Sequence, residues 1–146
     1  MTKNLIVERR QFYEPKEIFN NLKEKISKVR EMGEKIDFIT FVPDGEPTLD
    51  INIGEEIRMF KTFNIPVAVI TNSSLLFLES VRQDLFEADL VSLKVDTVNE
   101  TTFRKINRPH HSLDLNLILD GIVEFSKFFN GSIITETMLV EGLNFS

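Results

Sequence analysis

The strongest constraint on the fold of this chain is an alternation between two kinds of apolar segment. Short segments rich in Val, Ile, Phe and Thr have the composition of buried strands, and they cover residues 36–42, 66–71, 90–96 and 133–140. Segments with apolar residues every three or four positions are typical of helices with one buried face, and they cover residues 15–31, 50–62, 78–87, 99–106 and 114–129. Strands that alternate with helices form parallel sheets through right-handed crossovers. The pattern therefore predicts an α/β fold with about four parallel strands and outer helices, either a doubly wound sheet or part of a (β/α) barrel.

The size and composition of the chain limit the protein classes to which it can belong. Its 146 residues are enough for a single domain over residues 1–146. No apolar stretch reaches the roughly 20 residues of a membrane-spanning helix, and no secretory signal is visible, so we expect a cytoplasmic protein without membrane contact. A net charge of −6 argues against duplex nucleic acid as the main partner. Because the sequence contains no Cys, the chain supplies no thiolate to a nucleophilic, zinc or iron–sulfur site.

Each predicted strand is followed by a polar loop. The loops contain Asp44-Gly45-Glu46-Pro47, Thr71-Asn72-Ser73-Ser74, Asp96-Thr97-Val98-Asn99 and Glu141-Gly142-Leu143-Asn144. The carboxyl ends of parallel strands lie at one rim of the sheet, which is where ligands bind in such folds. Helix caps use the same polar residues, so a polar loop by itself does not identify a site.

The third predicted strand carries charged residues on one face. Ser92, Lys94 and Asp96 alternate with apolar residues and therefore share the face opposite to the helices. A buried Lys and Asp are costly unless they pair with each other or with a ligand. Glu136, on the fourth predicted strand, is a second candidate partner for Lys94. Either a ligand site or an internal ion pair without a ligand satisfies this pattern.

The turn after the first predicted strand combines three residues with distinct physical properties. Gly45 permits a positive φ and a close approach of the backbone to a ligand, Glu46 offers a carboxylate to a cation, and Pro47 restricts the turn. These properties suit a site for a small cationic group.

A basic segment interrupts the acidic chain at residues 103–111. It contains Arg104, Lys105, Arg108, His110 and His111, which favour a phosphate group or an RNA substrate if they are not simply a solvated loop. The two adjacent His residues have no third ligand at a suitable spacing, so the segment does not predict a metal site.

Five segments in order resemble the radical S-adenosylmethionine (radical SAM) superfamily. The segments are residues 41–50 with Gly45-Glu46-Pro47, 69–76, 91–96, 106–110 and 135–142. They are most similar to the iron–sulfur oxidoreductases related to the tRNA wybutosine-synthesis enzyme. The resemblance implies a partial (β/α) barrel that binds S-adenosylmethionine over a [4Fe-4S] cluster and generates a 5′-deoxyadenosyl radical.

The resemblance also implies which residues bind the cofactor. In the family the Gly-Glu-Pro turn receives the methionine ammonium, which corresponds here to Gly45, Glu46 and Pro47. Polar residues at the ends of later strands hold the carboxylate and the ribose. These correspond to Thr71, Asn72, Lys94, Asp96 and Glu136.

The sequence departs from the family at the cluster. The family's three Cys residues, spaced Cys-x3-Cys-x2-Cys, belong to the loop after the first barrel strand, and residues 5–13 resemble the stretch that follows this loop. We therefore expect a domain without its first strand, its cluster loop and its C-terminal strands. Such a domain leaves sheet edges and the inner face of the sheet open, which favours a cysteine-bearing upstream segment or subunit, or a second copy of the chain, as partner.

Three functions stay open on the sequence alone. The first is a truncated or split radical SAM domain that is inactive without its cluster. The second is a non-catalytic binding or assembly module, and the third is an α/β protein that binds a phosphorylated metabolite through Lys94, Asp96 and the basic segment. The substrate stays open between RNA, a small molecule and a protein.

Overall fold

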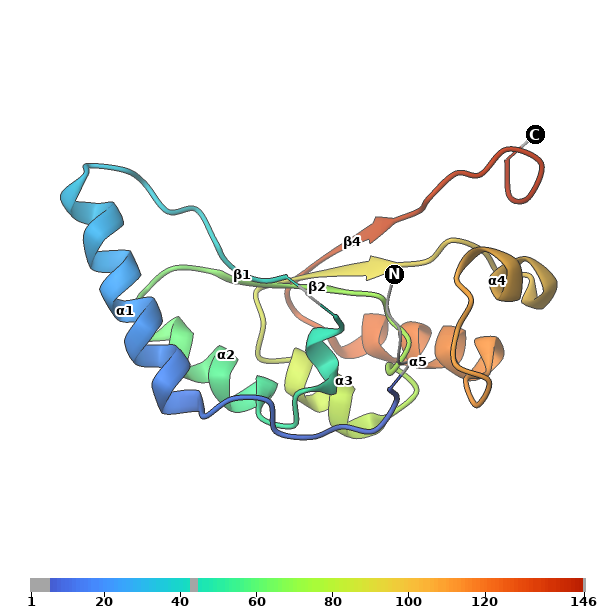
Figure 1. Cartoon of the computed structure of the whole chain (residues 1–146), viewed down its shortest axis with the longest axis horizontal. Coiled ribbons are helices and arrows are strands. Elements are labelled where there is room, and N and C mark those ends of the chain that lie inside the picture. The colour runs from blue at the N-terminus through green and yellow to red at the C-terminus, as the bar shows by residue number, and fades with distance from the viewer. Residues whose placement is uncertain (1–5, 43–44, 146) are drawn as a thin grey trace.

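A computed structural model describes residues 6–42 and 45–145 of the chain. The strands form one parallel sheet in which the spatial order β1-β2-β3-β4 is the order of the sequence (Figure 1). The elements are α1 (Pro15–Glu31), β1 (Ile39–Phe41), the 3-10 helix η1 (Pro47–Leu49), α2 (Ile53–Lys61), β2 (Val67–Thr71), α3 (Glu79–Leu85), β3 (Leu90–Lys94), α4 (Glu100–Ile106), α5 (Leu115–Phe128) and β4 (Ser132–Glu136). The predicted α/β fold with parallel strands is confirmed.

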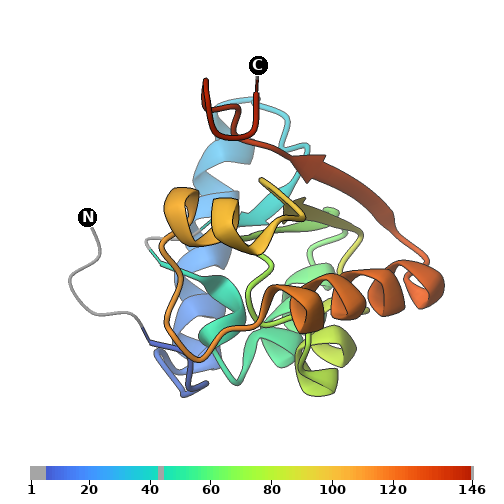
Figure 2. The same cartoon turned by 90° about the vertical axis from the view of Figure 1, so that its right-hand side faces the viewer.

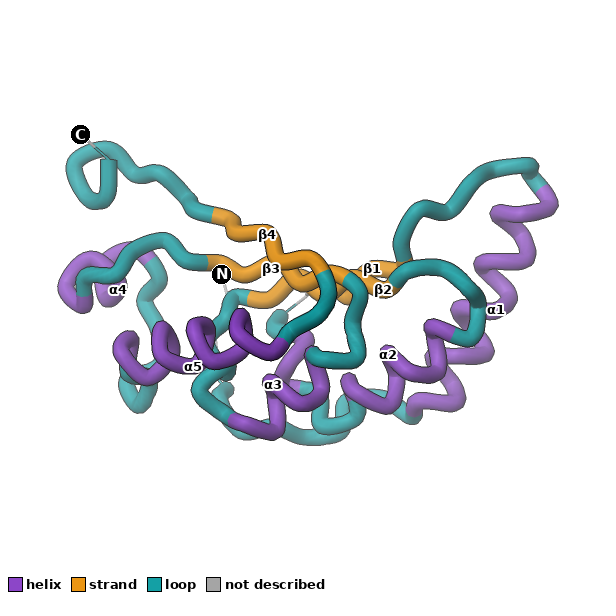
Figure 3. The backbone as a smooth tube through the Cα atoms, turned by 180° about the vertical axis from the view of Figure 1, so that it is seen from behind, coloured by secondary structure: helices purple, strands orange, loops and turns teal. Residues whose placement is uncertain are grey.

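Helices α2, α3 and α5 lie on one side of the sheet, and α1 packs against α2 at the β1 end of the molecule (Figures 1 and 3). The strand residues that face these helices form the core, and Val67, Val69 and Val91 are completely buried there. The opposite face is open, and Val42 and Ile134 are 66% and 51% exposed. A doubly wound sheet has helices on both faces, so this one-sided arrangement is a partial barrel.

Local sequence signals explain where the helices begin and end. Pro15 occupies the first turn of α1, where its missing N–H is harmless, and Gly33 follows the helix with a φ of 75°, which favours glycine. Helix α5 is capped by Asp114, whose carboxylate accepts the backbone N–H groups of Asn116 and Leu117 at 2.8 and 3.2 Å. These helices lie where the sequence predicted them.

The strands are shorter than the sequence predicted, and the two outer strands differ most. Strand β1 begins at Ile39, opposite the first residue of β2, and ends at Phe41 although β2 continues to Thr71. Strand β3 ends at Lys94 instead of residue 96. Strand β4 ends at Glu136 instead of reaching residue 140, because β3 ends opposite it and the Asp96 carboxylate accepts the N–H of Met138 at 2.6 Å. Apolar composition therefore marked the strands but not their ends.

None of the helices in residues 6–42 and 45–145 is both long and apolar enough to cross a membrane.

Candidate cofactor-binding rim

The carboxyl ends of the strands bring the predicted site residues to one rim of the sheet, which Figure 2 views from that end. In the sheet register, Thr71 lies beside Leu93 and Lys94 lies beside Glu136. Glu46 precedes η1, whose Pro47 occupies the first helical position and so fixes the start of this turn. Gly45 lies beside Glu46 in an open region, because no heavy atom lies within 4 Å of where its Cβ would be.

The Glu46 carboxylate is held by four hydrogen bonds. Its Oε1 accepts the hydroxyls of Thr48 and Thr71 at 2.7 and 2.6 Å and the N–H of Thr48 at 3.1 Å. Among the described residues its Oε2 accepts a single bond, from the N–H of Asn72 at 2.7 Å. Three of the four bonds therefore fall on Oε1, and Oε2 is the oxygen with room for a further donor. The carboxylate is therefore fixed in position and still able to bind a cation.

Thr71 and Asn72 support this carboxylate in different ways. The Thr71 side chain is 2% exposed, and its hydroxyl donates to Glu46 while accepting the N–H of Ser73 at 3.0 Å. The Asn72 side chain is exposed, and its Oδ1 accepts the N–H of Ser74 at 2.9 Å. Thr71 therefore orients the Glu46 carboxylate from a buried position, whereas the Asn72 side chain lies at the surface of the rim.

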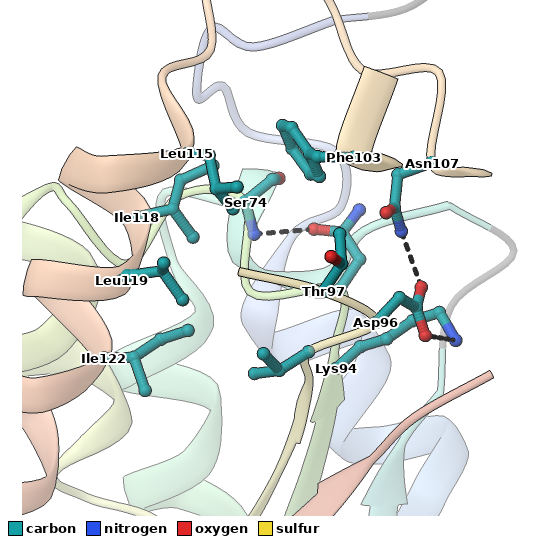
Figure 4. Close-up of a pocket in the computed structure, with 12 residues that line it drawn as sticks. Ser74, Lys94, Asp96, Thr97, Phe103, Asn107, Leu115, Ile118, Leu119 and Ile122 are labelled. Atoms are coloured by element: carbon teal, nitrogen blue, oxygen red, sulfur yellow. Dashed lines mark hydrogen bonds and ion pairs between the residues drawn. The ribbon is translucent and has the colours of Figure 1, made fainter. Parts of the chain in front are cut away.

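The Lys94 ammonium lies between two carboxylates. Its Nζ is 3.2 Å from Oδ1 of Asp96 (Figure 4). The same Nζ is 3.5 Å from Oε1 of Glu136, and the Lys94 side chain is 28% exposed. The Glu136 side chain is 62% exposed. The internal ion pair considered from the sequence is therefore present, and it leaves the ammonium partly open to solvent.

Asp96 ties together the segments around Lys94. Its buried carboxylate accepts the N–H of Met138 and the side-chain amide of Asn107, both at 2.6 Å, in addition to the Lys94 ammonium. Its backbone carbonyl accepts the side-chain amide of Asn144 at 2.8 Å. These donors come from β3, from the residue after α4 and from the segment after β4. Asp96 therefore fixes Lys94 and also joins the segments that surround the rim.

Two hollows meet at Asn72. A small one of about 30 Å³ lies between the end of β3 and the apolar face of α5, and Lys94, Phe103 and Ile118 line it (Figure 4). A large open one of about 960 Å³ lies beside β1, and Gly45, Glu46 and Pro47 line it. Asn72 lines both hollows. Glu46 and Lys94, which are 48 positions apart, therefore flank one residue of the same rim.

One residue of the basic segment, Arg104, forms hydrogen bonds within its own loop. Arg104 bonds the Glu100 carboxylate at 2.7 Å and the carbonyl oxygens of His110 and Leu113 at 3.3 and 2.6 Å. Lys105, Arg108 and His111 are exposed. No group of three or more metal-ligating side chains occurs in the described part of the chain, so this loop and the rim offer no metal cage there.

The sequence did not predict a role for two polar residues near the rim, Arg9 and Glu56. Arg9 bonds the carbonyl oxygens of Thr48 and Asp50 at 2.9 and 2.8 Å and pairs with Asp84 at 2.5 Å, so it fastens the N-terminal segment beside η1. Glu56 is 2% exposed, and burial, together with the negative charges of Asp50 and Glu55, raises its pKa from 4.5 to about 7. The sequence signal that could have indicated burial of Glu56 was its position among the apolar residues on one face of α2.

Comparison with known proteins identifies the family. The sequence matches the Radical SAM superfamily over residues 7–146. It is 50% identical to the UPF0026 protein MJ1312 of Methanocaldococcus jannaschii over 145 residues, which are 99% of this chain and 44% of that protein. The chain belongs to the radical SAM superfamily, as the motifs predicted.

Solved structures share the fold. The crystal structure of archaeal TYW1 superposes with a TM-score of 0.63 at 14% identity, covering 98% of this chain and 53% of that chain. A domain of the pyruvate-formate lyase-activating enzyme from Bacteroides vulgatus superposes with a TM-score of 0.55 at 21% identity, covering 73% of this chain and 62% of that domain. The chain thus spans a little under half of its Methanocaldococcus relative and about half of archaeal TYW1.

Proposed function

We propose that this chain forms the S-adenosylmethionine-binding part of a radical SAM enzyme. Membership of the superfamily implies S-adenosylmethionine and a [4Fe-4S] cluster as cofactors in general. The observation that carries the proposal for this chain is the state of Glu46, whose carboxylate is immobilised by four hydrogen bonds while Oε2 keeps one free acceptor position beside an open hollow.

The rim residues fit the amino-acid end of S-adenosylmethionine. Glu46 accepts the methionine ammonium, and the partly exposed ammonium of Lys94 attracts the methionine carboxylate. Glu136, which is exposed and only 3.5 Å from Lys94, accepts the ribose hydroxyls together with Asn72. The Asp96 side chain is 0% exposed and already binds Lys94, Asn107 and Met138, so it holds Lys94 and the rim in place and is closed to a ligand from solvent.

The residues of this chain do not fit a [4Fe-4S] cluster, because such clusters are held by Cys thiolates and the sequence has none. We therefore derive no redox step through this chain. Its role is to bind and orient the cofactor whose one-electron cleavage, when a cluster is present, supplies the 5′-deoxyadenosyl radical. A cysteine-bearing segment or subunit provides the cluster, and Arg9 supports its placement by fastening the N-terminal segment beside η1, which directly follows Glu46.

Calorimetric titration of the chain with S-adenosylmethionine tests this proposal. We expect Glu46→Gln to weaken binding at least tenfold, because it removes about 1.4 kcal/mol or more of charge-assisted hydrogen bonding. Lys94→Met should weaken binding similarly. Glu55→Gln, which changes an exposed carboxylate on α2, is the matched control and should bind as the wild type does. Unchanged affinity in Glu46→Gln, or no binding by the wild type, would contradict the proposal.

The same titration separates the other two functions. A phosphorylated metabolite as ligand predicts binding of phosphate compounds that Arg108→Gln weakens and Glu46→Gln does not. A non-catalytic module predicts S-adenosylmethionine binding that no cysteine-bearing partner converts into cleavage of the cofactor.

A further inference from the structure

The N-terminal segment, residues 9–12, is bonded to the turn that follows Glu46. The N–H of Arg10 donates to the carbonyl oxygen of Leu49 at 2.9 Å, and the Arg10 carbonyl oxygen accepts the N–H of Ile51 at 3.1 Å. This pair of bonds is a short parallel bridge between parts of the chain that lie far apart in the sequence. The segment and the turn therefore hold each other in place.

Arg9 adds a side chain to this contact that reaches three parts of the fold. Its guanidinium donates to the carbonyl oxygens of Thr48 and Asp50 at 2.9 and 2.8 Å, within η1 and directly after it. It also pairs with Asp84 of α3 and donates to the hydroxyl of Ser80 at 3.3 Å. The Arg9 side chain is only 11% exposed. A planar guanidinium with several acceptors fixes their relative positions, because its donors form a rigid fork.

One residue links Arg9 to the Glu46 carboxylate. Thr48 is completely buried, and its carbonyl oxygen accepts the Arg9 guanidinium. The N–H and the hydroxyl of the same Thr48 both donate to Oε1 of Glu46, at 3.1 and 2.7 Å. The other two donors to this carboxylate, Thr71 and Asn72, belong to β2 and to the loop after it. Glu46 is therefore held from two sides, by the sheet and by a turn that Arg9 fixes.

We propose that Arg9 is a positioning residue for the cofactor site and acts through Thr48 on Glu46. Arg9 itself does not touch the ligand, and its role is to keep the Glu46 carboxylate in the orientation that receives a cationic group. The inference rests on the proposed function for the identity of that ligand, whereas the coupling between Arg9 and Glu46 exists with or without it. A site that is fixed in advance binds more tightly, because less freedom is lost on binding. Coupling is reciprocal, so a ligand at Glu46 also strengthens the docking of the N-terminal segment.

Binding of S-adenosylmethionine, measured by equilibrium dialysis under conditions in which each variant is folded, tests the coupling. We expect Arg9→Met to weaken binding by about fivefold or more. Arg10→Met removes the same charge from the neighbouring, exposed residue and should bind within about twofold of the wild type. Arg9→Lys keeps a cation for Asp84 but lacks the fork that bridges two carbonyl oxygens, so it should fold even where Arg9→Met does not and still weaken binding by about threefold or more.

Gly131→Ala separates positioning from a general loss of stability. Gly131 precedes β4, at the end of the strands opposite to the rim, and its Cβ would lie 2.6 Å from the carbonyl oxygen of Asp89. The substitution therefore destabilises the fold without a contact to Glu46. We expect its affinity to stay within about twofold of the wild type. If Gly131→Ala weakens binding as strongly as Arg9→Met does, Arg9 acts only on stability and the proposal is overturned.

A double-mutant cycle asks whether Arg9 acts through Glu46. In the Glu46→Gln chain, Arg9→Met should weaken binding by less than about twofold, because the carboxylate that Arg9 positions is already absent. The same loss of affinity in both backgrounds would overturn the path through Glu46.

Amide hydrogen exchange without a ligand keeps this inference separate from the proposed function. The N–H groups of Thr48 and Asn72 both donate to Glu46. In Arg9→Met we expect both to exchange about tenfold faster or more, relative to the N–H of Ser132 at the opposite end of the sheet, which reports general destabilisation. Unchanged relative exchange would overturn the coupling. Faster exchange in a chain that binds no S-adenosylmethionine would support the coupling and refute only the proposed function, whereas wild-type affinity in both Arg9 variants would overturn the inference alone.

Discussion

The buried carboxylate of Glu56 predicts an unusual dependence of stability on pH. Its pKa is about 7 in the folded chain, against an ordinary value of 4.5. Between these values the folded chain holds a proton that the unfolded chain has lost, so stability decreases as the pH rises. Below pH 4.5 both states are protonated and the penalty is absent, whereas above pH 7 both are ionised and it is fully expressed. The free energy of unfolding should therefore fall by about 2.5 kcal/mol between pH 5 and pH 8 from this group alone.

Glu56→Gln removes this ionisation and keeps the shape of the side chain. We expect the variant to be more stable than the wild type at pH 8, by an amount that exceeds its advantage at pH 5 by about 2.5 kcal/mol. At the usual scaling this is a rise in Tm of roughly 5–10 °C at pH 8. Urea unfolding of both proteins at both pH values, followed by circular dichroism, gives the difference in unfolding free energy between variant and wild type at each pH. Subtracting the value at pH 5 from the value at pH 8 gives a double difference, in which the cost of burying the introduced Gln amide cancels because it is the same at both pH values.

Glu55→Gln is the control for this experiment, because its side chain is exposed on the same turn of α2. It removes one exposed negative charge, the smallest of the three causes that raise the pKa of Glu56, and leaves the burial of Glu56 unchanged, so its double difference should stay below about 0.5 kcal/mol. A wild type and a Glu56→Gln chain with the same pH dependence would refute the reasoning, and would mean that Glu56 already has a donor.

Four further predictions concern the rim and the packing. Arg9→Met should lower the free energy of unfolding by about 3 kcal/mol, measured in urea, because it removes a donor from Asp84 and from the carbonyl oxygens of Thr48 and Asp50, whereas Arg10→Met removes no side-chain hydrogen bond that the described residues make. Asp96→Ala should cost about 3 kcal/mol by the same measurement and should also weaken S-adenosylmethionine binding, because Lys94, Asn107 and Met138 lose their shared acceptor. Gly121→Ala should cost at least about 2 kcal/mol, since its Cβ would lie 2.3 Å from the carbonyl oxygen of Leu76, while Gly45→Ala, in open space, should leave thermal stability nearly unchanged. The open face of the sheet should cause self-association that Ile134→Lys reduces in sedimentation velocity, and a wild type that stays monomeric at all concentrations would contradict this.

The order of helices and strands could be predicted because each segment carries its own signal. Residues 15–31 begin at a Pro, repeat apolar residues at helical spacing and end before a Gly, and all three features are local. The ends of β1 and β4 could not be predicted in the same way. They depend on which residues of β2 and β3 lie opposite, which the sequence of the strand itself does not contain.

The site could be predicted only to the level of which residues reach the rim. The alternation along β3 placed Lys94 on the face away from the helices, and the turn placed Glu46 after β1. The bond from Asn72 to Glu46 spans 26 positions and has no local signal. Glu56 was missed because a charged residue on an amphipathic helix is usually exposed, whereas in the folded chain Glu56 is 2% exposed.

Three carboxylates of this chain differ in burial and in hydrogen-bond partners, and these differences predict their roles. Asp96 has its donors within the chain, so its removal should cost stability first and affinity only as a consequence. Glu46 is fixed on one oxygen and has one free position on the other, so Glu46→Gln should cost affinity with little effect on stability. Glu56 has an oxygen without any donor in the described chain, so its neutralisation should increase stability. The three substitutions, compared in one unfolding and one binding assay, therefore distinguish a structural carboxylate, a ligand-binding carboxylate and a buried carboxylate whose charge destabilises the fold.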